Sequence, residues 1–393
     1  MRNHNDEFWT WIQDHLNENP AELSLKFRGK TIWIEDAIMQ VQCRRKTKKK
    51  LEKELTNPQF YFPSTLSAEQ CTGDQLASFH ASLINTGDTV IDLTCGLGID
   101  TLHFAEIAKS VTAIEQNPEL CEALEHNASV LGFSNITVIN ADCIEFLANT
   151  DEIYDVAFID PARRGAEGER VYGLHDCSPD VITMLPSIRK HCRRLIIKAS
   201  PMLDITQVIR DLPLTSSVYA TGNDTECKEI VTVVDFEQND SAEPTIHALS
   251  SSSDFAFTKS DEAAANASFS EPHGTGFLYE PNPEIMKTAP FKLLSQIFKL
   301  DKIGSNTHLY WSKNRIEGFP GNVFRIARIL DYSSGNIKRF AREFTSIMVT
   351  ARNFGLTADQ LRKKLKVKDG GDLRLFAVSS INDKKIMIVA EEE

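Results

Sequence analysis

The segment Thr89–Asp100, TVIDLTCGLGID, combines a carboxylate with a glycine turn. Val90, Ile91 and Leu93 are typical of a buried parallel strand. Gly96 and Gly98 permit a tight turn in which the backbone approaches a ligand closely. A helix is expected to follow over about residues 99–109. This order of strand, turn and helix is typical of sites that hold nucleotide-like ligands.

The turn departs from dinucleotide sites in one position. Such sites have a third glycine three residues after the second, where a pyrophosphate rests on the helix N-terminus, but this chain has Thr101 there. Asp92 ends the strand beside the turn, where its negative charge would repel a pyrophosphate and would suit a sulfonium that also has an amino group. These residues favour S-adenosylmethionine over NAD, and an NAD-linked oxidoreductase stays the weaker alternative.

Two further acids follow the next two predicted strands. Glu115 stands about 20 residues after Asp92, where an acid accepts the ribose hydroxyls of such a cofactor, or it only begins the following helix. Asp142 receives the adenine amine or caps a helix over residues 144–148. Three strand-end acids in order are a stronger signal than one alone. We expect the cofactor to be held by Asp92, Thr94, Gly96, Gly98, Glu115 and Asp142.

The fourth predicted strand runs into Asp160-Pro-Ala-Arg-Arg164, where side chains can reach a substrate. Methyl transfer needs a nucleophile in line with the sulfonium methyl, and the Asp160 side chain and the Pro161 carbonyl are suited to position an amine. The alternative is that Asp-Pro only makes a turn. Arg163 and Arg164 are candidates for contacts with phosphates or bases, or they are ordinary surface arginines.

Alternating strands and helices must position these residues. Strands are predicted at 90–93, 110–115, 136–140, 156–159 and 195–198, with helices between them, which indicates an α/β fold with a Rossmann-like, doubly wound sheet. Strands at 216–220 and 228–236 form an antiparallel hairpin that closes the sheet edge. One domain is therefore expected at residues 76–236.

The flanking regions differ in pattern. Residues 1–75 predict a helical N-terminal region, and residues 237–275, rich in Ser, Ala and acids, predict a linker or insertion. The end of the chain, from about residue 276, predicts a small α+β region with helices over 284–299, 334–343 and 357–365. Its strands are expected over 308–311, 347–351, 373–379 and 385–390.

Composition limits the class of protein. The chain has 393 residues, 41% hydrophobic and 25% charged, which is typical of soluble proteins with more than one domain. No apolar run approaches the roughly 18 residues of a membrane span, so we expect a cytoplasmic protein without a membrane partner. The eight cysteines include no Cys-x-x-Cys pair, which favours reduced thiols and no metal site.

Charge is divided unevenly along the chain. The net charge is −12, but residues 276–393 have 20 Lys and Arg against 13 Asp and Glu. An acidic catalytic half joined to a basic half is compatible with a nucleic-acid substrate, although a basic surface is often only a solubility feature. The segment 44–50 has six basic residues in seven, and is either a solvated helix face or a stripe that contacts phosphates.

These residues together resemble a known family. Segment 90–100, Glu115, Asp142 and Asp160-Pro161 resemble the class I S-adenosylmethionine-dependent methyltransferases over about residues 76–236. The N-terminal helices, the Asp-Pro-Ala-Arg-Arg turn and the closing segments 352–356, 361–365 and 368–371 are more narrowly similar to bacterial methyltransferases with a ferredoxin-like subdomain and a C-terminal THUMP-like domain. The resemblance implies a ferredoxin-like subdomain at 276–317, a THUMP-like domain at 318–393, and an RNA substrate such as rRNA or tRNA.

The substrate turn differs from that of the relatives. Amine-directed nucleic-acid methyltransferases have Asn/Asp-Pro-Pro followed by an aromatic residue, whereas this chain has Ala162 and Arg163. An arginine plane also stacks on a base, so a base nitrogen of RNA stays the leading acceptor. Uracil-5 methyltransferases carry Asp-Pro-Pro-Arg but need a cysteine nucleophile, and the turn at 198–201 has no thiol. A further alternative is an RNA-binding protein that retains the fold without catalysis.

Overall fold

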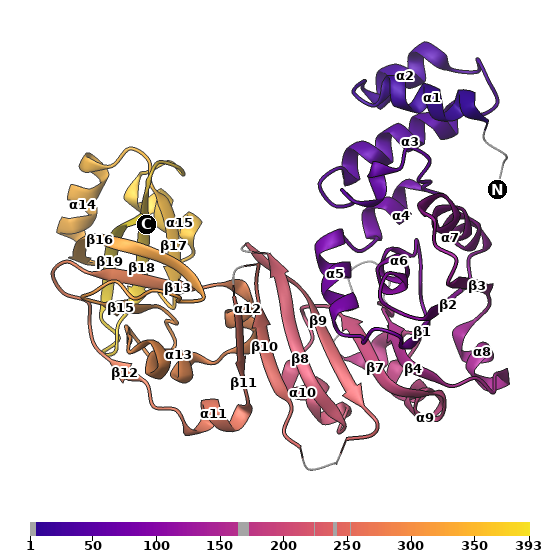
Figure 1. The fold of residues 1–393 in the computed structure, drawn as a ribbon. Helices are drawn as coiled ribbons and strands as arrows, with labels where there is room; N and C mark the ends of the chain where they lie inside the picture. Colours follow the sequence, from indigo (N-terminus) through magenta and orange to yellow (C-terminus); the bar gives the residue numbers. More distant parts are fainter. Residues whose placement is uncertain (1–4, 164–172, 224, 239–241, 252) are drawn as a thin grey trace. The chain divides into compact units, whose positions relative to one another are not determined.

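The computed structural model describes residues 5–163, 173–223, 225–238, 242–251 and 253–393 (Figure 1). The chain divides into two compact units, each with its own internal contacts. The first unit comprises residues 1–216 and 231–242, and the second comprises residues 217–230 and 243–393. None of the helices in the described ranges combines the length and the apolar character that crossing a bilayer requires.

Short helices form the N-terminal region, as predicted. Asn5 and Asn19 cap the first two through their side chains, and buried Phe8, Ile12 and Leu23 pack against α3 in a small apolar core. The elements are α1 (Asp6–His15), α2 (Pro20–Phe27), α3 (Ile34–Thr47), η1 (Glu54–Thr56), α4 (Thr65–Gln70) and α5 (Asp74–Ser82).

Buried polar side chains of α3 fix the segment that leaves it. The Gln40 amide donates to the Phe62 carbonyl (2.7 Å) and accepts from the Phe62 amide (3.0 Å). Arg44 is buried and donates to the carbonyls of Pro58 and Phe60. The first arginine of the basic run 44–50 is therefore structural, because it satisfies backbone acceptors inside the protein.

A nine-stranded sheet follows, with the strand order β11-β10-β8-β9-β7-β4-β1-β2-β3. Strands β1, β2, β3, β4 and β7 are parallel, with helices between them in the chain, so the predicted doubly wound α/β fold is confirmed. The elements are β1 (Thr89–Asp92), α6 (Ile99–Ala105), β2 (Ser110–Glu115), α7 (Pro118–Leu131), β3 (Ile136–Asn140), α8 (Cys143–Asn149), β4 (Tyr154–Ile159), β5 (Ala162–Arg163), η2 (Leu174–Asp176), β6 (Cys177–Ser178), α9 (Val181–His191), β7 (Cys192–Ala199), α10 (Ile205–Asp211), β8 (Thr215–Asn223) and β9 (Glu226–Asp235).

The predicted hairpin is β8 and β9, but these strands do not end the sheet. β10 (Thr245–Leu249) pairs parallel with β8, and β11 (Asp254–Phe257) pairs antiparallel with β10. Residues 237–275, for which we expected a linker or insertion, thus contain two sheet strands and also α11 (Lys259–Ala264) and β12 (Ser268–Phe269). Alternating burial in β10 gives the physical reason, because Ile246 and Ala248 are buried on one face.

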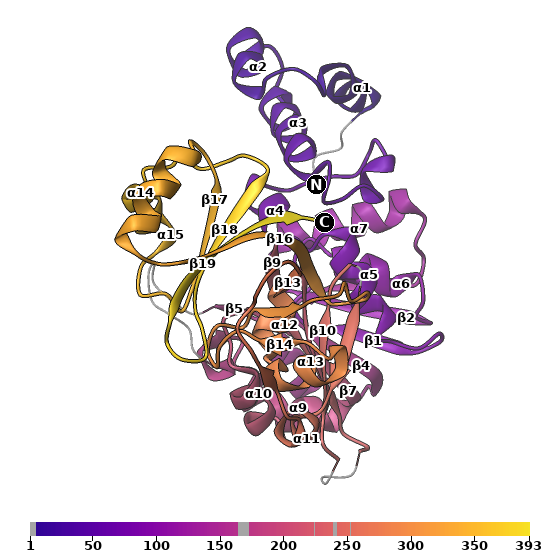
Figure 2. The same ribbon diagram turned by 90° about the vertical axis from the view of Figure 1, so that its left-hand side faces the viewer.

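The chain ends in an eight-stranded sheet of order β12-β14-β15-β13-β16-β19-β18-β17. Figure 2 shows α14 and α15 beside β17 and β18 of this sheet. Phe376 and Val378 of β18 face one apolar core, and Leu375 and Ala377 face another that also contains residues of α14 and α15. The elements are β13 (Phe277–Pro281), α12 (Pro283–Thr288), α13 (Phe291–Phe298), β14 (Asp301–Lys302), β15 (Tyr310–Ser312), β16 (Gly321–Asp331), α14 (Ser334–Glu343), β17 (Met348–Arg352), α15 (Ala358–Leu365), β18 (Leu373–Ser379) and β19 (Lys385–Glu392).

The prediction of one continuous helix over residues 284–299 is wrong. The stretch 284–299 forms two helices, α12 and α13, which are separated at Ala289 and Pro290. Ala289 ends α12 in the left-handed region (φ +63°), because proline disfavours a helical conformation at the residue before it.

Replacing Gln40 by leucine should destabilise the first unit. The Phe62 N–H and C=O would stay buried without partners, at about 1–3 kcal/mol for each group. Urea unfolding followed by circular dichroism measures the loss, with Gln42→Leu on the half-buried side of the same helix as the control. Equal midpoints for the two variants would contradict the structural role of Gln40.

Candidate active site

The carboxyl ends of the parallel strands meet at one edge of the nine-stranded sheet. In the register, Asp92 of β1 pairs with Ala113 of β2 and with Phe158 of β4, so Glu115 and Asp160 follow two residues beyond their partners. Glu115 in turn pairs with Asn140, next to the segment that contains Asp142. The sheet thus brings the predicted strand-end acids to the same edge, as ligand sites in open α/β sheets require.

The glycine turn has the backbone conformation that its sequence predicts. Gly96 and Gly98 have φ of +55° and +86°, in the left-handed region. A Cβ at Gly96 would meet nothing within 4 Å, whereas a Cβ at Gly98 would lie 2.3 Å from Cδ1 of Leu124 in α7. Gly98 therefore allows close packing of the turn on α7, and Gly96 leaves space beside the backbone.

Asp92 is completely buried at the end of β1. Its carboxylate accepts from the Thr94 amide (3.1 Å) and from the Thr101 hydroxyl (2.7 Å). Burial raises the pKa of Asp92 to about 7; the nearby Asp100 and Asp160 carboxyls add to the rise, and the bond from Thr101 opposes it. Without a ligand, the environment of Asp92 thus disfavours its ionised form. A cation beside the carboxyl would favour that form.

Thr101, which replaces the third glycine, has a structural role that the sequence did not indicate. It supplies the hydroxyl that satisfies the buried Asp92.

Glu115 connects β2 to the glycine turn. Its carboxylate accepts from the Gly96 amide (3.0 Å) and from the Asn117 amide (2.8 Å), so it orients the turn and the start of α7 together. Asp142 caps α8 by accepting from the amides of Ile144 and Glu145, and its other oxygen accepts from the Gln116 side chain. The capping alternative for Asp142 is therefore present in the structure, on a residue that borders the same edge.

Asp160 lies beside the glycine turn and is paired with a lysine. Its amide donates to the Thr94 hydroxyl (2.8 Å), which ties β4 to the segment after β1. Its carboxylate accepts from Nζ of Lys198 at the end of β7 (2.5 Å); the Asp160 side chain is 39% exposed and the Lys198 side chain 13% exposed. The carboxylate thus has a buried cation on one side and solvent on the other.

A chain of polar contacts continues behind Lys198. Lys198 Nζ also donates to the Thr72 hydroxyl (3.0 Å), which donates to Asp100, and the other oxygen of Asp100 meets Nδ1 of His80 (2.7 Å). Burial opposes the ionisation of Asp100, but His80 and Lys198 outweigh it and hold the Asp100 pKa at about 2.

Sequence reasoning missed these polar partners of the site. A lysine that ends an otherwise apolar strand, in Leu195-Ile-Ile-Lys198, was the one available signal.

The structure describes two of the three other residues that we predicted to contact the substrate. Pro161 is buried, and Arg163 pairs through its backbone with Cys177 in the two-stranded β5–β6 sheet. Arg164 lies outside the described residues. The eight cysteines all lie within the described residues and form no disulfide bond there.

Comparison with known proteins identifies the domains. Residues 77–165 match the family model of the ribosomal RNA adenine dimethylase, residues 277–320 match a ferredoxin-like domain, and residues 321–392 match a THUMP-like domain. The chain contains a class I methyltransferase domain. It is followed by ferredoxin-like and THUMP-like domains, so the resemblance stated from the sequence is confirmed.

Solved and curated relatives agree with this assignment. A candidate methyltransferase of Porphyromonas gingivalis W83 superimposes with a TM-score of 0.87 at 26% identity, covering 98% of this chain and 97% of that one. An uncharacterized RNA methyltransferase of Mycoplasma mobile is 32% identical over 105 residues, which are 27% of this chain and 29% of the relative. The 23S rRNA (uracil(1939)-C(5))-methyltransferase RlmD of Marinomonas posidonica is 37% identical over 81 residues, 20% of this chain and 18% of the relative. The chain thus spans less than a third of these curated relatives.

The methyltransferase domain fits the predicted cofactor, S-adenosylmethionine. The open space at Gly96 and the completely buried acid at Asp92 agree with a ligand that combines a nucleoside with a cationic part. The prediction of an enzyme of the methyltransferase class is confirmed at the level of this domain.

Substituting alanine for Gly98 should damage the turn by crowding Leu124. Gly87 provides a matched control, because it also has positive φ (+91°) but an added Cβ meets nothing within 4 Å. We expect Gly98→Ala to lose roughly 1–3 kcal/mol more stability than Gly87→Ala, measured by urea unfolding. Equal losses would show that only backbone strain matters at Gly98.

The raised pKa of Asp92 predicts a pH-dependent loss of stability. Below the ordinary value of 3.8 the carboxyl is protonated in both states; as the pH rises toward about 7, only the unfolded chain releases the proton, so stability falls. The variant Asp92→Asn should therefore gain stability relative to the wild type between pH 4 and pH 7, by up to about 1.4 kcal/mol per pH unit, and no further above pH 7. Chemical unfolding of both proteins across this range gives the comparison, and a pH-independent difference would contradict it.

Proposed function

We propose that this protein transfers a methyl group from S-adenosylmethionine to a base nitrogen of RNA. The observation that supports this most directly is the bond from the Asp160 amide to Thr94, because it places the Asp160 carboxylate beside the glycine turn. A substrate amine held by Asp160 would then lie next to a cofactor held by that turn.

The cofactor would be held along the sheet edge. Gly96 leaves room for the ligand. Glu115 would accept the ribose hydroxyls and Asp142 would receive the adenine amine. Asp92 would act through its charge, because a cationic ligand favours its ionised form. The cofactor supplies an electrophilic methyl group on its sulfonium.

Asp160 and Pro161 would position the acceptor. The solvent-facing part of the Asp160 carboxylate and the Pro161 carbonyl accept hydrogen bonds from the substrate amine, so its nitrogen lone pair points at the methyl carbon. As the new N–C bond forms and the S–C bond breaks, the nitrogen loses a proton toward Asp160 or water. Lys198 holds the carboxylate in place from the buried side.

An RNA substrate is supported from outside the catalytic domain. The domain at 321–392 matches a THUMP-like model, the curated relatives are named as RNA methyltransferases, and residues 276–393 have an excess of basic residues. Arg163 and Arg164 follow the proposed acceptor site directly in the chain and would contact phosphates or bases.

Methylation of uracil at carbon 5 is the second candidate, because relatives of that activity match part of this chain. That chemistry needs a cysteine nucleophile, and the turn at 198–201 has none. Cys192 is buried at the start of β7, at the strand end opposite to Lys198, and burial raises its pKa to about 12. Cys177 is also buried. The nitrogen acceptor therefore fits the described residues better.

Replacing Asp160 by alanine should abolish transfer while the cofactor still binds. We expect the rate of labelled methyl transfer to RNA to fall by roughly 100-fold or more, because the group that positions the amine is gone. Asp160→Asn, which keeps an oxygen acceptor, should retain part of the rate. Asp155→Ala, at the other end of β4, is the control.

Calorimetric titration with S-adenosylmethionine separates the two roles. The expected result is a similar cofactor affinity for Asp160→Ala and the wild type. Full turnover of Asp160→Ala would refute the assignment of the site, and RNA binding by the wild type without transfer to any RNA pool would favour a non-catalytic RNA-binding protein.

A further inference from the structure

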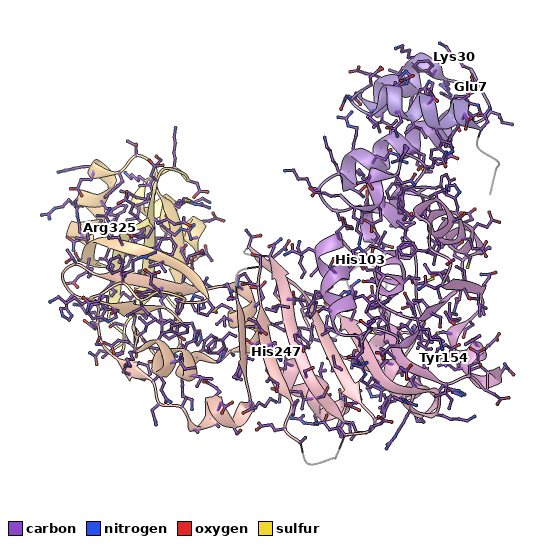
Figure 3. The ribbon with its side chains drawn as sticks, in the orientation of Figure 1. Glu7, Lys30, His103, Tyr154, His247 and Arg325 are labelled. Carbon is purple, nitrogen blue, oxygen red and sulfur yellow. The ribbon has the colours of Figure 1, made fainter. Side chains whose placement is uncertain are left out.

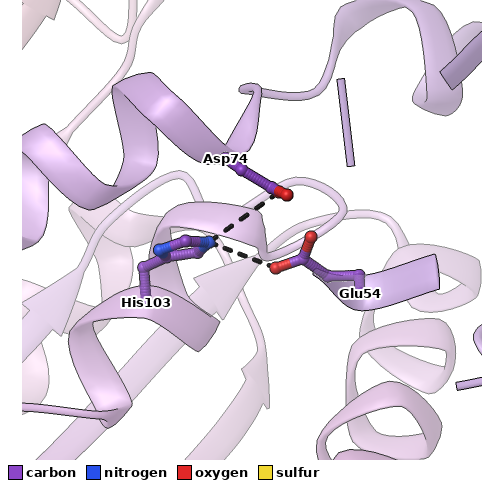
Figure 4. Close-up of side chains that lie close together, drawn as sticks. All are labelled: Glu54, Asp74 and His103. Atoms are coloured by element: carbon purple, nitrogen blue, oxygen red, sulfur yellow. Dashed lines mark hydrogen bonds and ion pairs between the residues drawn. The ribbon is translucent and has the colours of Figure 1, made fainter. Parts of the chain in front are cut away.

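Three side chains that could bind a metal gather in the first unit, and none of them belongs to the site just described. Glu54 belongs to η1, Asp74 is the first residue of α5, and His103 stands in α6, the helix that follows the glycine turn. Figure 3 labels His103 within the first unit. One ligand atom of each lies within 4.8 Å of the other two, and Figure 4 shows the two carboxylates and the imidazole directed toward one another.

The cluster is mostly buried, with the Asp74 side chain 22% exposed, and two of its oxygens have no hydrogen-bond partner in the described part of the chain. The side chains of Glu54 and His103 are each 3% exposed. Among the described residues, Oε2 of Glu54 and Oδ1 of Asp74 are buried and have no hydrogen-bond partner. Buried carboxylate oxygens normally have partners, so two such oxygens in one cluster need an explanation.

The contacts of His103 leave a place for a cation. Nδ1 lies 3.2 Å from the Ser78 hydroxyl, while Nε2 lies 3.1 Å from Oε1 of Glu54 and 4.0 Å from Oδ1 of Asp74. When Nδ1–H donates to Ser78, Nε2 presents a lone pair toward the carboxylate oxygens, which is the form of histidine that binds metals. In this tautomer the imidazole lone pair and the carboxylate oxygens face one another without a shared proton, and a cation placed between them would bind both.

The ammonium groups of the neighbouring Lys50 and Lys53 interact with groups outside this cluster. Lys53 forms an ion pair with Glu106 through its side chain and reaches Asp74 only through its backbone amide (2.8 Å). Lys50 donates to the carbonyl of Glu69 (2.8 Å). The two carboxylates are therefore not neutralised by these lysines.

We infer that Glu54, Asp74 and His103 bind one divalent transition-metal ion of the Zn²⁺ type. One imidazole and two carboxylates suit such an ion, whereas Mg²⁺ and Ca²⁺ prefer oxygen ligands alone. With ligand atoms about 2.0–2.2 Å from zinc, their separations must be below ~4.4 Å, so small side-chain rotations complete the site. Ser78 would orient the imidazole from outside the ligand set.

The ion would connect the N-terminal helical region to the methyltransferase domain. Glu54 precedes the predicted start of that domain and His103 lies in its first helix after the glycine turn. Cysteine spacing led us to expect no metal, and ligands this far apart in sequence form no recognisable motif. The inference is independent of the proposed methyl transfer.

Metal binding to the full chain tests the inference. The purified protein is stripped with a chelator and dialysed, then titrated with Zn²⁺ against a fluorescent zinc indicator, and the bound zinc is counted by mass spectrometry. We expect one Zn²⁺ for each chain and a higher melting temperature with Zn²⁺. Titration with Co²⁺ should give visible absorption bands of a low-symmetry site.

Variants assign the ligands. His103→Gln and Glu54→Gln should weaken Zn²⁺ binding by more than the roughly 10- to 100-fold that loss of an outer partner causes. His247→Gln is the matched control, because His247 also contacts a carboxylate, that of Asp254 (3.0 Å), on β10 of the second unit, and it should bind Zn²⁺ as the wild type does. Circular dichroism checks that each variant is folded.

The wild-type result alone decides the matter if a variant does not fold. A folded wild-type chain that binds no Zn²⁺, gains no thermal stability from it and gives no Co²⁺ bands would overturn the inference. Equal Zn²⁺ binding by the wild type and by folded His103→Gln would overturn it as well.

Discussion

A parallel sheet places several acidic side chains at one edge of the methyltransferase domain. The structure of the domain depends on the donors and cations that stabilise these carboxylates. Asp92, Asp100 and Asp160 influence one another there, and two of them are buried. Lys198 lies between Asp160 and Thr72, and Nδ1 of His80 contacts the other oxygen of Asp100. Asp92 has hydroxyl and amide donors but no cationic partner among the described residues, so a positively charged ligand would stabilise its ionised form.

The same contacts fix the geometry of the site. Thr94 joins β1 to β4 through the Asp160 amide, and Glu115 joins β2 to the glycine turn through the Gly96 amide. The first bond joins residues 66 positions apart in the sequence, and the second joins residues 19 positions apart. A site that is held by strands of one sheet is more rigid than a site on loops. Methyl transfer requires this rigidity because the acceptor must be placed accurately.

Much of the fold could be predicted because local sequence determines it. The strands over 110–115, 136–140 and 373–379 and the helix over 334–343 are apolar runs or amphipathic stretches bounded by turns and caps, and they occur as predicted. The helix over 284–299 was wrong because Pro290 interrupts a favourable apolar pattern. The strand β10 was missed because its short alternation lies within a polar segment.

Less of the site than of the fold could be predicted from the sequence. Acids at strand ends can be recognised from their order, but Thr72 and Lys198 meet through the fold, although 126 residues separate them. The same limit applies to Glu54, Asp74 and His103, which come from three different helices. Contacts of this kind depend on tertiary packing, and no spacing in one sequence indicates them.

The most direct measurement of the central claim is a comparison of modified nucleosides, by mass spectrometry, in RNA from cells with and without the gene. The account predicts that deletion removes one nucleoside methylated at a base nitrogen, and that the wild-type gene restores it while the Asp160→Ala variant does not. An unchanged set of nucleosides, or the loss of 5-methyluridine instead, would contradict it.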